Sequence, residues 1–160
     1  MFWFNIIRLT PEERMYREGI RFVLVVLLLC FAATAGAADL NYMDAARFKG
    51  LCSSKAPMIL ADFQKPHDFK KHHFFAAIET DAYPVKTAAD KAKLDVILQM
   101  FQKTGNDVIL IGPRGGPASK RAANYLVERG IPAEKVFILE GGIKKWPDQE
   151  MLLDVAGGCA

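Results

Sequence analysis

The chain has 160 residues, of which 51% are hydrophobic and 24% charged, and its formal net charge is +3. This length allows one domain of ordinary size plus a terminal segment. The near balance of charge, with no interleaving of basic and aromatic residues, argues against nucleic-acid binding. The three cysteines show no C-x-x-C or paired His–Cys spacing of a zinc site. No cofactor is predicted.

An apolar run over residues 22–38 follows Arg17 and Arg21 and becomes rich in Ala and Gly at its end. A basic segment, a short apolar core and small residues in this order are typical of a secretory signal. The small residues fit cleavage before Ala38 or before Asp39. The chain is therefore predicted to be exported to the periplasm.

These boundaries divide the chain into three parts. Residues 1–14 are predicted to be an N-terminal extension before Met15, either an upstream start that is not used or a genuine long cytosolic segment. Residues 15–37 are the predicted signal peptide and residues 38–160 the exported domain, which touches the membrane only through that signal. The alternative is an uncleaved inner-membrane anchor, although the apolar run is shorter than the roughly 20 residues of a spanning helix.

Cleavage would remove Cys30 and leave Cys52 and Cys159 in an oxidising compartment. Two cysteines permit one disulfide, and we predict that these two form it. Cys52 follows the first predicted helix, where the helix dipole disfavours a reactive thiolate. A free thiol at this position remains an alternative.

The first half of the predicted domain alternates short helices with apolar segments. In order, it is expected to contain a helix over 43–51 that begins near Asp44 and ends near Gly50, a buried strand over 56–63, a turn with a short helix over 64–75, and an extended segment over 74–78.

The second half has the clearer periodicity. The longest predicted helix covers 87–103, because Leu94, Ile97, Leu98 and Phe101 follow the helical spacing and Gly105 ends it. It is followed by a buried strand over 108–111, a helix over 119–129 and a buried strand over 136–139. Strands that alternate with helices predict an α/β fold, a small parallel sheet with helices on both faces.

A glycine-rich loop follows the predicted strand over 108–111 and precedes a helix. Its residues are Gly112, Pro113, Arg114, Gly115, Gly116, Pro117, Ala118 and Ser119. Such a loop lies at the carboxyl end of the sheet, where backbone N–H groups and a helix N-terminus favour a small anion such as sulfate, phosphate or a carboxylate. Arg114, Lys120 and Arg121 add positive charge. Alternatively, the glycines only make the turn. Ser119 is expected to cap the helix or to lie in its first turn.

Three separated segments resemble the rhodanese domain family. The segment over 59–78 matches the family's first half at Asp62, Pro66, Asp68, Phe69, His73, Ala77 and Ile78, and departs from it at Gln64, His72 and Ala76. The strand, loop and helix over 107–130 match its central part. The segment over 136–147 resembles its closing strand, with Gly141-Gly142 and a packing Trp at Trp146.

The resemblance implies a rhodanese-like fold and places Gly112 where the family has its catalytic cysteine. We therefore expect an inactive domain that acts as an anion-binding or accessory module for an unknown envelope protein. A related phosphatase activity needs Cys with Arg six positions on, where this chain has Gly112 and Ala118. One alternative is sulfur transfer through Cys52 or Cys159.

Three histidines, His67, His72 and His73, lie within seven residues and suggest a second alternative, a metal-binding protein. His72 and His73 are adjacent, so on a regular element they diverge. The resemblance implies an orienting hydrogen bond for His73. The simplest interpretation leaves the other two on the surface and predicts no metal site.

Overall fold

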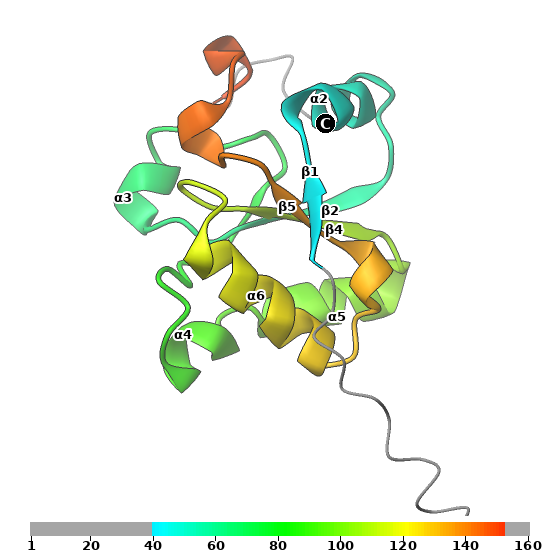
Figure 1. Cartoon of the computed structure of the whole chain (residues 1–160), viewed down its shortest axis with the longest axis vertical. Helices are drawn as coiled ribbons and strands as arrows, with labels where there is room; N and C mark the ends of the chain where they lie inside the picture. Colours follow the sequence, from blue (N-terminus) through cyan, green and yellow to red (C-terminus); the bar gives the residue numbers. More distant parts are fainter. Residues whose placement is uncertain (1–39, 153–160) are drawn as a thin grey trace, which may run out of the picture. The chain divides into compact units, whose positions relative to one another are not determined.

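The computed structural model describes residues 40–152; the predicted signal segment and Cys159 lie outside these residues. One five-stranded sheet forms the centre, and all its strands are parallel (Figure 1). In spatial order the strands are β1 (Asn41–Met43), β5 (Val136–Leu139), β4 (Asp107–Ile111), β2 (Met58–Asp62) and β3 (Ile78–Glu79). The predicted α/β fold and the predicted strands over 56–63, 108–111 and 136–139 are confirmed, with differences only at strand ends.

In residues 40–152, five α-helices and one 3-10 helix connect the strands, and two further 3-10 helices follow the last strand. The helices are α2 (Ala45–Ser53), α3 (Pro66–Phe69), α4 (Ala88–Ala92), α5 (Asp95–Thr104) and α6 (Pro117–Glu128), and the 3-10 helices are η1 (Ala133–Lys135), η2 (Ile143–Lys145) and η3 (Gln149–Met151). In the described part of the chain, no helix combines the length and the apolar character needed to cross a membrane.

Both faces of the sheet are covered, as the continuous apolar strands predict. Along β4, Val108 and Leu110 pack into a core cluster with residues of α5 and α6, whereas Ile109 and Ile111 pack into a second cluster with residues of α2. The alternation follows from the two-residue period of a strand. Figure 1 shows α2 on one side of the sheet and α5 and α6 on the other.

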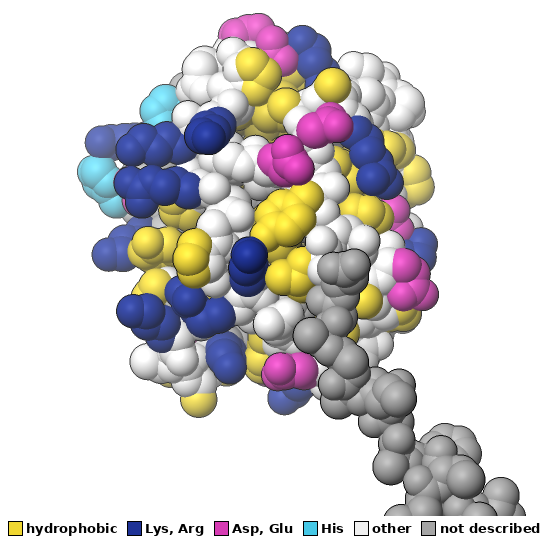
Figure 2. Space-filling view, in the orientation of Figure 1, with side chains coloured by type: hydrophobic (Ala, Val, Ile, Leu, Met, Phe, Trp, Pro, Cys, Tyr) yellow, Lys and Arg dark blue, Asp and Glu magenta, His cyan; other side chains and the backbone are white. Residues whose placement is uncertain are grey.

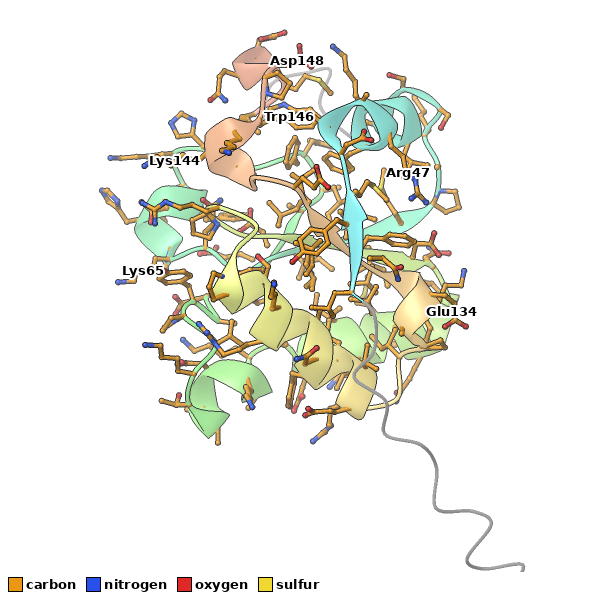
Figure 3. All side chains as sticks on the ribbon, in the orientation of Figure 1. Arg47, Lys65, Glu134, Lys144, Trp146 and Asp148 are labelled. Carbon is orange, nitrogen blue, oxygen red and sulfur yellow. The ribbon has the colours of Figure 1, made fainter. Side chains whose placement is uncertain are left out.

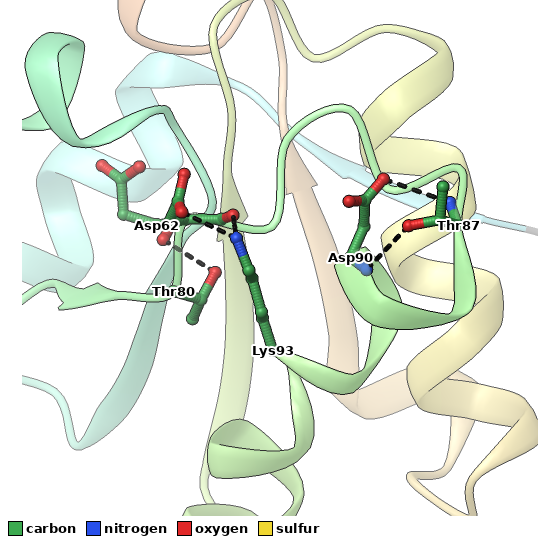
Figure 4. A network of polar contacts seen from close by, with 6 residues as sticks. Asp62, Thr80, Thr87, Asp90 and Lys93 are labelled. Carbon is green, nitrogen blue, oxygen red and sulfur yellow. Dashed lines mark hydrogen bonds and ion pairs between the residues drawn. The ribbon is translucent and has the colours of Figure 1, made fainter.

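The predicted helix over 87–103 is wrong in one respect, because it is two helices. Thr87 and Asp90 form a reciprocal capping box that starts α4, and Lys93 then donates to the backbone and the carboxylate of Asp81 at 2.8 and 2.7 Å (Figure 4). The chain bends at Lys93–Leu94 before α5 begins, and Leu94 is fully buried. The apolar periodicity runs through this bend, so it gives no signal of the break.

The predicted extended segment over 74–78 is wrong in its middle, because Phe75 and Ala76 form a turn in which Ala76 has φ +60°, and only Ile78–Glu79 form the strand β3. The other boundaries shift by a few residues. Asp44 caps α2 as predicted, accepting from the N–H of Arg47 at 2.7 Å, but the helix continues past Gly50 to Ser53. The edge strand β1 was not predicted, since three residues are too few to show a period. Helix α6 begins at Pro117, a favoured first residue because its missing N–H would have no helical partner.

Candidate functional site

The β4–α6 loop lies at the carboxyl end of the central strand, where the sequence predicts an anion site. Within residues 40–152, no carbonyl or side chain accepts a hydrogen bond from the N–H of Arg114, Gly115 or Gly116. These donors are therefore available to a bound anion. Helix α6 follows directly, and its N-cap is Gly116 without a side-chain hydrogen bond. Ser119 is not the cap; it lies in the first turn of α6 and is 1% exposed.

A second glycine turn, Gly141-Gly142, packs against the β4–α6 loop and supports it. The N–H of Ile143 donates to the carbonyl of Gly112 at 3.0 Å, and the N–H of Lys144 donates to that of Pro113 at 3.1 Å. Gly142 has φ +57°, and a Cβ there would lie 2.7 Å from the nitrogen of Arg114 and closer still to the oxygen of Gly112. Only glycine allows this close approach, so the two turns hold each other in place.

The position expected for the family's nucleophile has no room for a side chain. A Cβ built on Gly112 would lie 2.7 Å from Cε2 of Phe63 and closer still to Cζ. Phe63 is fully buried in the cluster with α5 and α6. Sequence reasoning missed this residue, although the pairing of Asp62 with Ile111 makes Phe63 and Gly112 neighbours one position beyond the two strands.

Two adjoining pockets open beside the loop. One, of about 610 Å³, is lined by Gln64, Lys65, Asp68, Lys71, His72, Tyr83, Pro113, Arg114, Ile143, Lys144 and Gln149. The other, of about 370 Å³, shares Tyr83, Pro113 and Arg114 with it and is completed by Pro84, Lys86, Gly116, Pro117, Ala118, Ser119 and Arg121. Both volumes fall in the range of roughly 300–1,000 Å³ of ordinary ligand sites. The predicted loop residues and the His72 segment thus meet at one edge of the sheet.

The three cations predicted around the loop, Arg114, Lys120 and Arg121, differ in their contacts. Arg114 is exposed and lines both pockets. Arg121 donates from Nε to the carbonyl of Val85 at 3.1 Å and from Nη2 to that of Pro84 at 2.8 Å, so it fastens the turn after Tyr83 onto α6. Lys120 lines neither pocket. Arg114 therefore remains the principal cation of the predicted loop site.

The family model of the rhodanese-like domain matches residues 44–149. The chain belongs to the rhodanese-like domain family. No curated protein matches it.

Solved structures share the fold at low sequence identity. A rhodanese-related protein from Thermoplasma volcanium is 16% identical with a TM-score of 0.51, over 71% of this chain and 97% of the other. A Saccharomyces cerevisiae homologue of single-domain rhodanese and the Cdc25 phosphatase catalytic domain is 16% identical with a TM-score of 0.56, over 71% and 86%. An As/Sb reductase from Leishmania major is 12% identical with a TM-score of 0.52, over 68% and 77%.

In this rhodanese-like domain, Asp62 ends β2 as a buried carboxyl group. Its two oxygens accept from the backbone N–H and from Nε2 of Gln64, at 2.9 and 3.1 Å. Burial raises the pKa of Asp62 to about 7, against the lowering effect of these hydrogen bonds. Gln64 also donates to the carbonyl of His72 at 3.0 Å, and Thr80 donates to that of Asp62 at 3.1 Å (Figure 4). These hydrogen bonds join three segments of the chain next to the larger pocket, which Gln64 and His72 line.

The hydrogen bond predicted to orient the ring of His73 is confirmed. Its Nδ1 lies 2.7 Å from the carbonyl oxygen of Phe69, and its ring stacks on that of Phe69 with centroids 4.2 Å apart. His67 is exposed and lies 3.5 Å from the carboxylate of Asp68. Among residues 40–152, no group of three potential ligands is placed to hold a metal ion.

Cys52 and Trp146 belong to the hydrophobic cluster under α2. Cys52 is 6% exposed and lines neither pocket. Its predicted partner Cys159 lies outside the described residues, so the disulfide stays a prediction. Trp146 is 3% exposed and packs edge-on against Phe48 and Phe74, which confirms that it is a core residue.

Proposed function

We propose that this chain is an exported rhodanese-like domain that binds anions and does not transfer sulfur. The observation that carries the proposal is the contact between Phe63 and Gly112. Sulfur transfer in this fold requires a thiolate whose persulfide is held by the loop N–H groups. Here the site of the thiol has no side chain, and the ring of Phe63 fills the space beside it.

The loop keeps the features that stabilise negative charge. The free N–H groups of residues 114–116, the start of α6 and the Arg114 guanidinium all lie at the same end of the sheet. Such an arrangement holds a small oxyanion by backbone hydrogen bonds and charge, without covalent chemistry. Since Arg114 is exposed, affinity is expected to be modest and to fall with salt.

Two measurements on the exported domain test this proposal. We expect no cyanide-dependent turnover of thiosulfate above buffer. Titration with sulfate, phosphate or thiosulfate should shift the amide resonances of residues 113–120, and Arg114→Ala should reduce the shifts. Turnover that disappears in Cys52→Ser or Cys159→Ser would overturn the inactive assignment. Amides that do not move at millimolar anion would overturn the anion site.

Export rests on the sequence pattern of residues 15–37 alone. N-terminal sequencing of periplasmic protein should find a mature chain that begins at Ala38 or Asp39. Membrane-bound protein with an intact Met1 or Met15 would instead support the anchored form.

A further inference from the structure

The two pockets form a groove whose charge is almost entirely positive. We call it the basic groove, and its cations are Lys65, Lys71, Lys86, Arg114, Arg121 and Lys144. Asp68 is the one carboxylate among the lining residues. Figure 2 shows Lys and Arg side chains gathered on the side where α3 and the β4–α6 loop lie, and Figure 3 shows Lys65 and Lys144 on that side.

These cations have no carboxylate partners within residues 40–152. The ion pairs of Lys and Arg found there involve Lys49, Lys93, Arg129 and Lys135, and none of these lines the groove. The groove cations come from segments that are distant in sequence. Lys65 and Lys71 flank α3, Lys86 precedes α4, Arg114 lies in the β4–α6 loop, Arg121 lies in α6 and Lys144 lies in η2. Concave walls with one sign of charge focus the electrostatic field on an oppositely charged ligand.

The walls of the groove also offer apolar surface. Tyr83 and Pro113 line both pockets, Ile143 lines the larger one, and Pro84 and Pro117 line the smaller one. The hydrogen bonds from Arg121 to the carbonyls of Val85 and Pro84 hold the segment after Tyr83 in place, and this segment forms one wall of the smaller pocket. A ligand that alternates carboxylates with apolar side chains would satisfy both kinds of surface.

We infer that the basic groove binds an extended acidic peptide segment of a protein partner. The inference rests on the proposed function, because one carboxylate of the peptide would occupy the anion site of the β4–α6 loop. A peptide fits better than a lipid surface, because the cations line two concave pockets instead of a flat face. It fits better than a single-stranded nucleic acid, because bases stack on several aromatic side chains and the lining residues include only two aromatic rings, those of Tyr83 and His72.

The probe is a fluorescein-labelled peptide of about eight residues, alternating Glu and Leu, which extends over about 26 Å at about 3.3 Å per residue. Fluorescence anisotropy should show binding to the exported domain, which weakens with salt. The same peptide with Gln for Glu should not bind. The double variant Lys71→Glu/Lys144→Glu should weaken binding at least about tenfold.

The matched control is Lys55→Glu/Lys103→Glu, which changes the net charge equally. Lys55 and Lys103 are exposed and precede β2 and β4, at the opposite edge of the sheet. This variant should bind like the wild type. Equal loss in both variants, or binding of the Gln peptide, overturns the inference. Binding to phosphatidylglycerol vesicles without peptide binding overturns it in favour of a membrane.

The outcomes separate this inference from the proposed function. If sulfate shifts the loop amides and the Glu peptide does not bind, the groove assignment is wrong and the anion site stands. If the peptide binds and sulfate shifts no amide, the loop anion site is wrong, and the part of the inference that places a peptide carboxylate there is wrong with it, whereas peptide binding by the other groove cations is supported. Phosphate and chloride are also compared as competitors of the peptide. If both displace it at equal concentrations, the effect is ionic screening, which counts against a peptide carboxylate bound at the loop.

Discussion

The ring of Phe63 fills the space in which a side chain on Gly112 would begin. The two residues are adjacent because β2 and β4 pair in register up to Asp62 and Ile111, so each is the next residue beyond its strand. The glycine at the expected catalytic position and the phenylalanine beside it therefore depend on each other, because the ring occupies the space that the glycine leaves open. If residue 112 is the position of the family's cysteine, as we propose, we expect that Gly112→Cys alone would not restore activity, because the ring of Phe63 would have to move first.

The first prediction compares two glycine substitutions. Gly112→Ala should lower the free energy of unfolding by roughly 1–3 kcal/mol, as overpacking of a filled core does. Gly50→Ala is the control, because Gly50 is helical and has nothing within 4 Å of its Cβ position; it should stabilise by roughly 0.5–1 kcal/mol. Urea unfolding measures both. Equal effects would show that Phe63 does not restrict residue 112.

A double-mutant cycle tests the same contact directly. Phe63→Val should make room beside residue 112, so that Gly112→Ala costs less in the Phe63→Val background than in the wild type. We expect a coupling of at least about 0.5 kcal/mol between the two substitutions. Strict additivity in urea unfolding would contradict the contact.

The second prediction concerns the support of the loop by Gly142. Gly142→Ala should lower stability by clearly more than Gly105→Ala. Both glycines have left-handed φ, +57° and +66°, but a Cβ at residue 105 meets nothing within 4 Å. Gly105→Ala should therefore cost only the backbone term, about 1 kcal/mol. The Gly142 variant should also lose the anion-induced amide shifts over 113–120, whereas the Gly105 variant should keep them.

The third prediction concerns Asp62 and pH. Its pKa is about 7 in the folded domain, above the ordinary value of 3.8, chiefly through burial. The folded state therefore binds the proton more tightly than the unfolded state, and stability is lost as the pH rises from about 4 to about 7. The loss is on the order of a few kcal/mol. Asp62→Asn should flatten this part of the stability profile, measured by urea unfolding at several pH values.

Asp90 gives a control of opposite sign. Hydrogen bonds from the backbone N–H groups of Thr87 and Lys86 lower the pKa of Asp90, so its contribution is lost as the pH falls. Asp90→Asn should reduce the loss of stability at acid pH and leave the change between pH 4 and 7 intact. A neutral-pH slope that persists in Asp62→Asn would contradict the assignment to Asp62.

The fourth prediction concerns the disulfide between Cys52 and Cys159. It would close a loop of over a hundred residues, a crosslink worth on the order of 4 kcal/mol in the chain-entropy model. Protein recovered from the periplasm should show no titratable thiol under denaturing conditions until it is reduced, and reduction should lower its unfolding temperature. Two titratable thiols in the unreduced protein would reject the pairing.

Sequence reasoning succeeded where the signal is local. The strands β4 and β5 are short apolar runs bounded by polar residues or glycine, and Gly105 ends α5 as expected. It failed where one contact decides between two arrangements. The chain bends at Lys93, whose ammonium group binds the carboxylate of Asp81, and the apolar spacing continues through this bend without indicating that the helix is interrupted. The proximity of Phe63 and Gly112 depends on the register of two strands far apart in the chain.

The pairing at the edge of the sheet also bears on when the domain can fold. Strand β1 lies near the beginning of the predicted mature chain, yet among the strands of residues 40–152 it pairs with β5 alone, with Asn41 opposite Phe137. Contacts of such long sequence separation form late and slow folding. A chain still in synthesis therefore cannot complete its sheet until the residues of β5 have been made, so β1 has to wait for a partner about a hundred residues further along the chain.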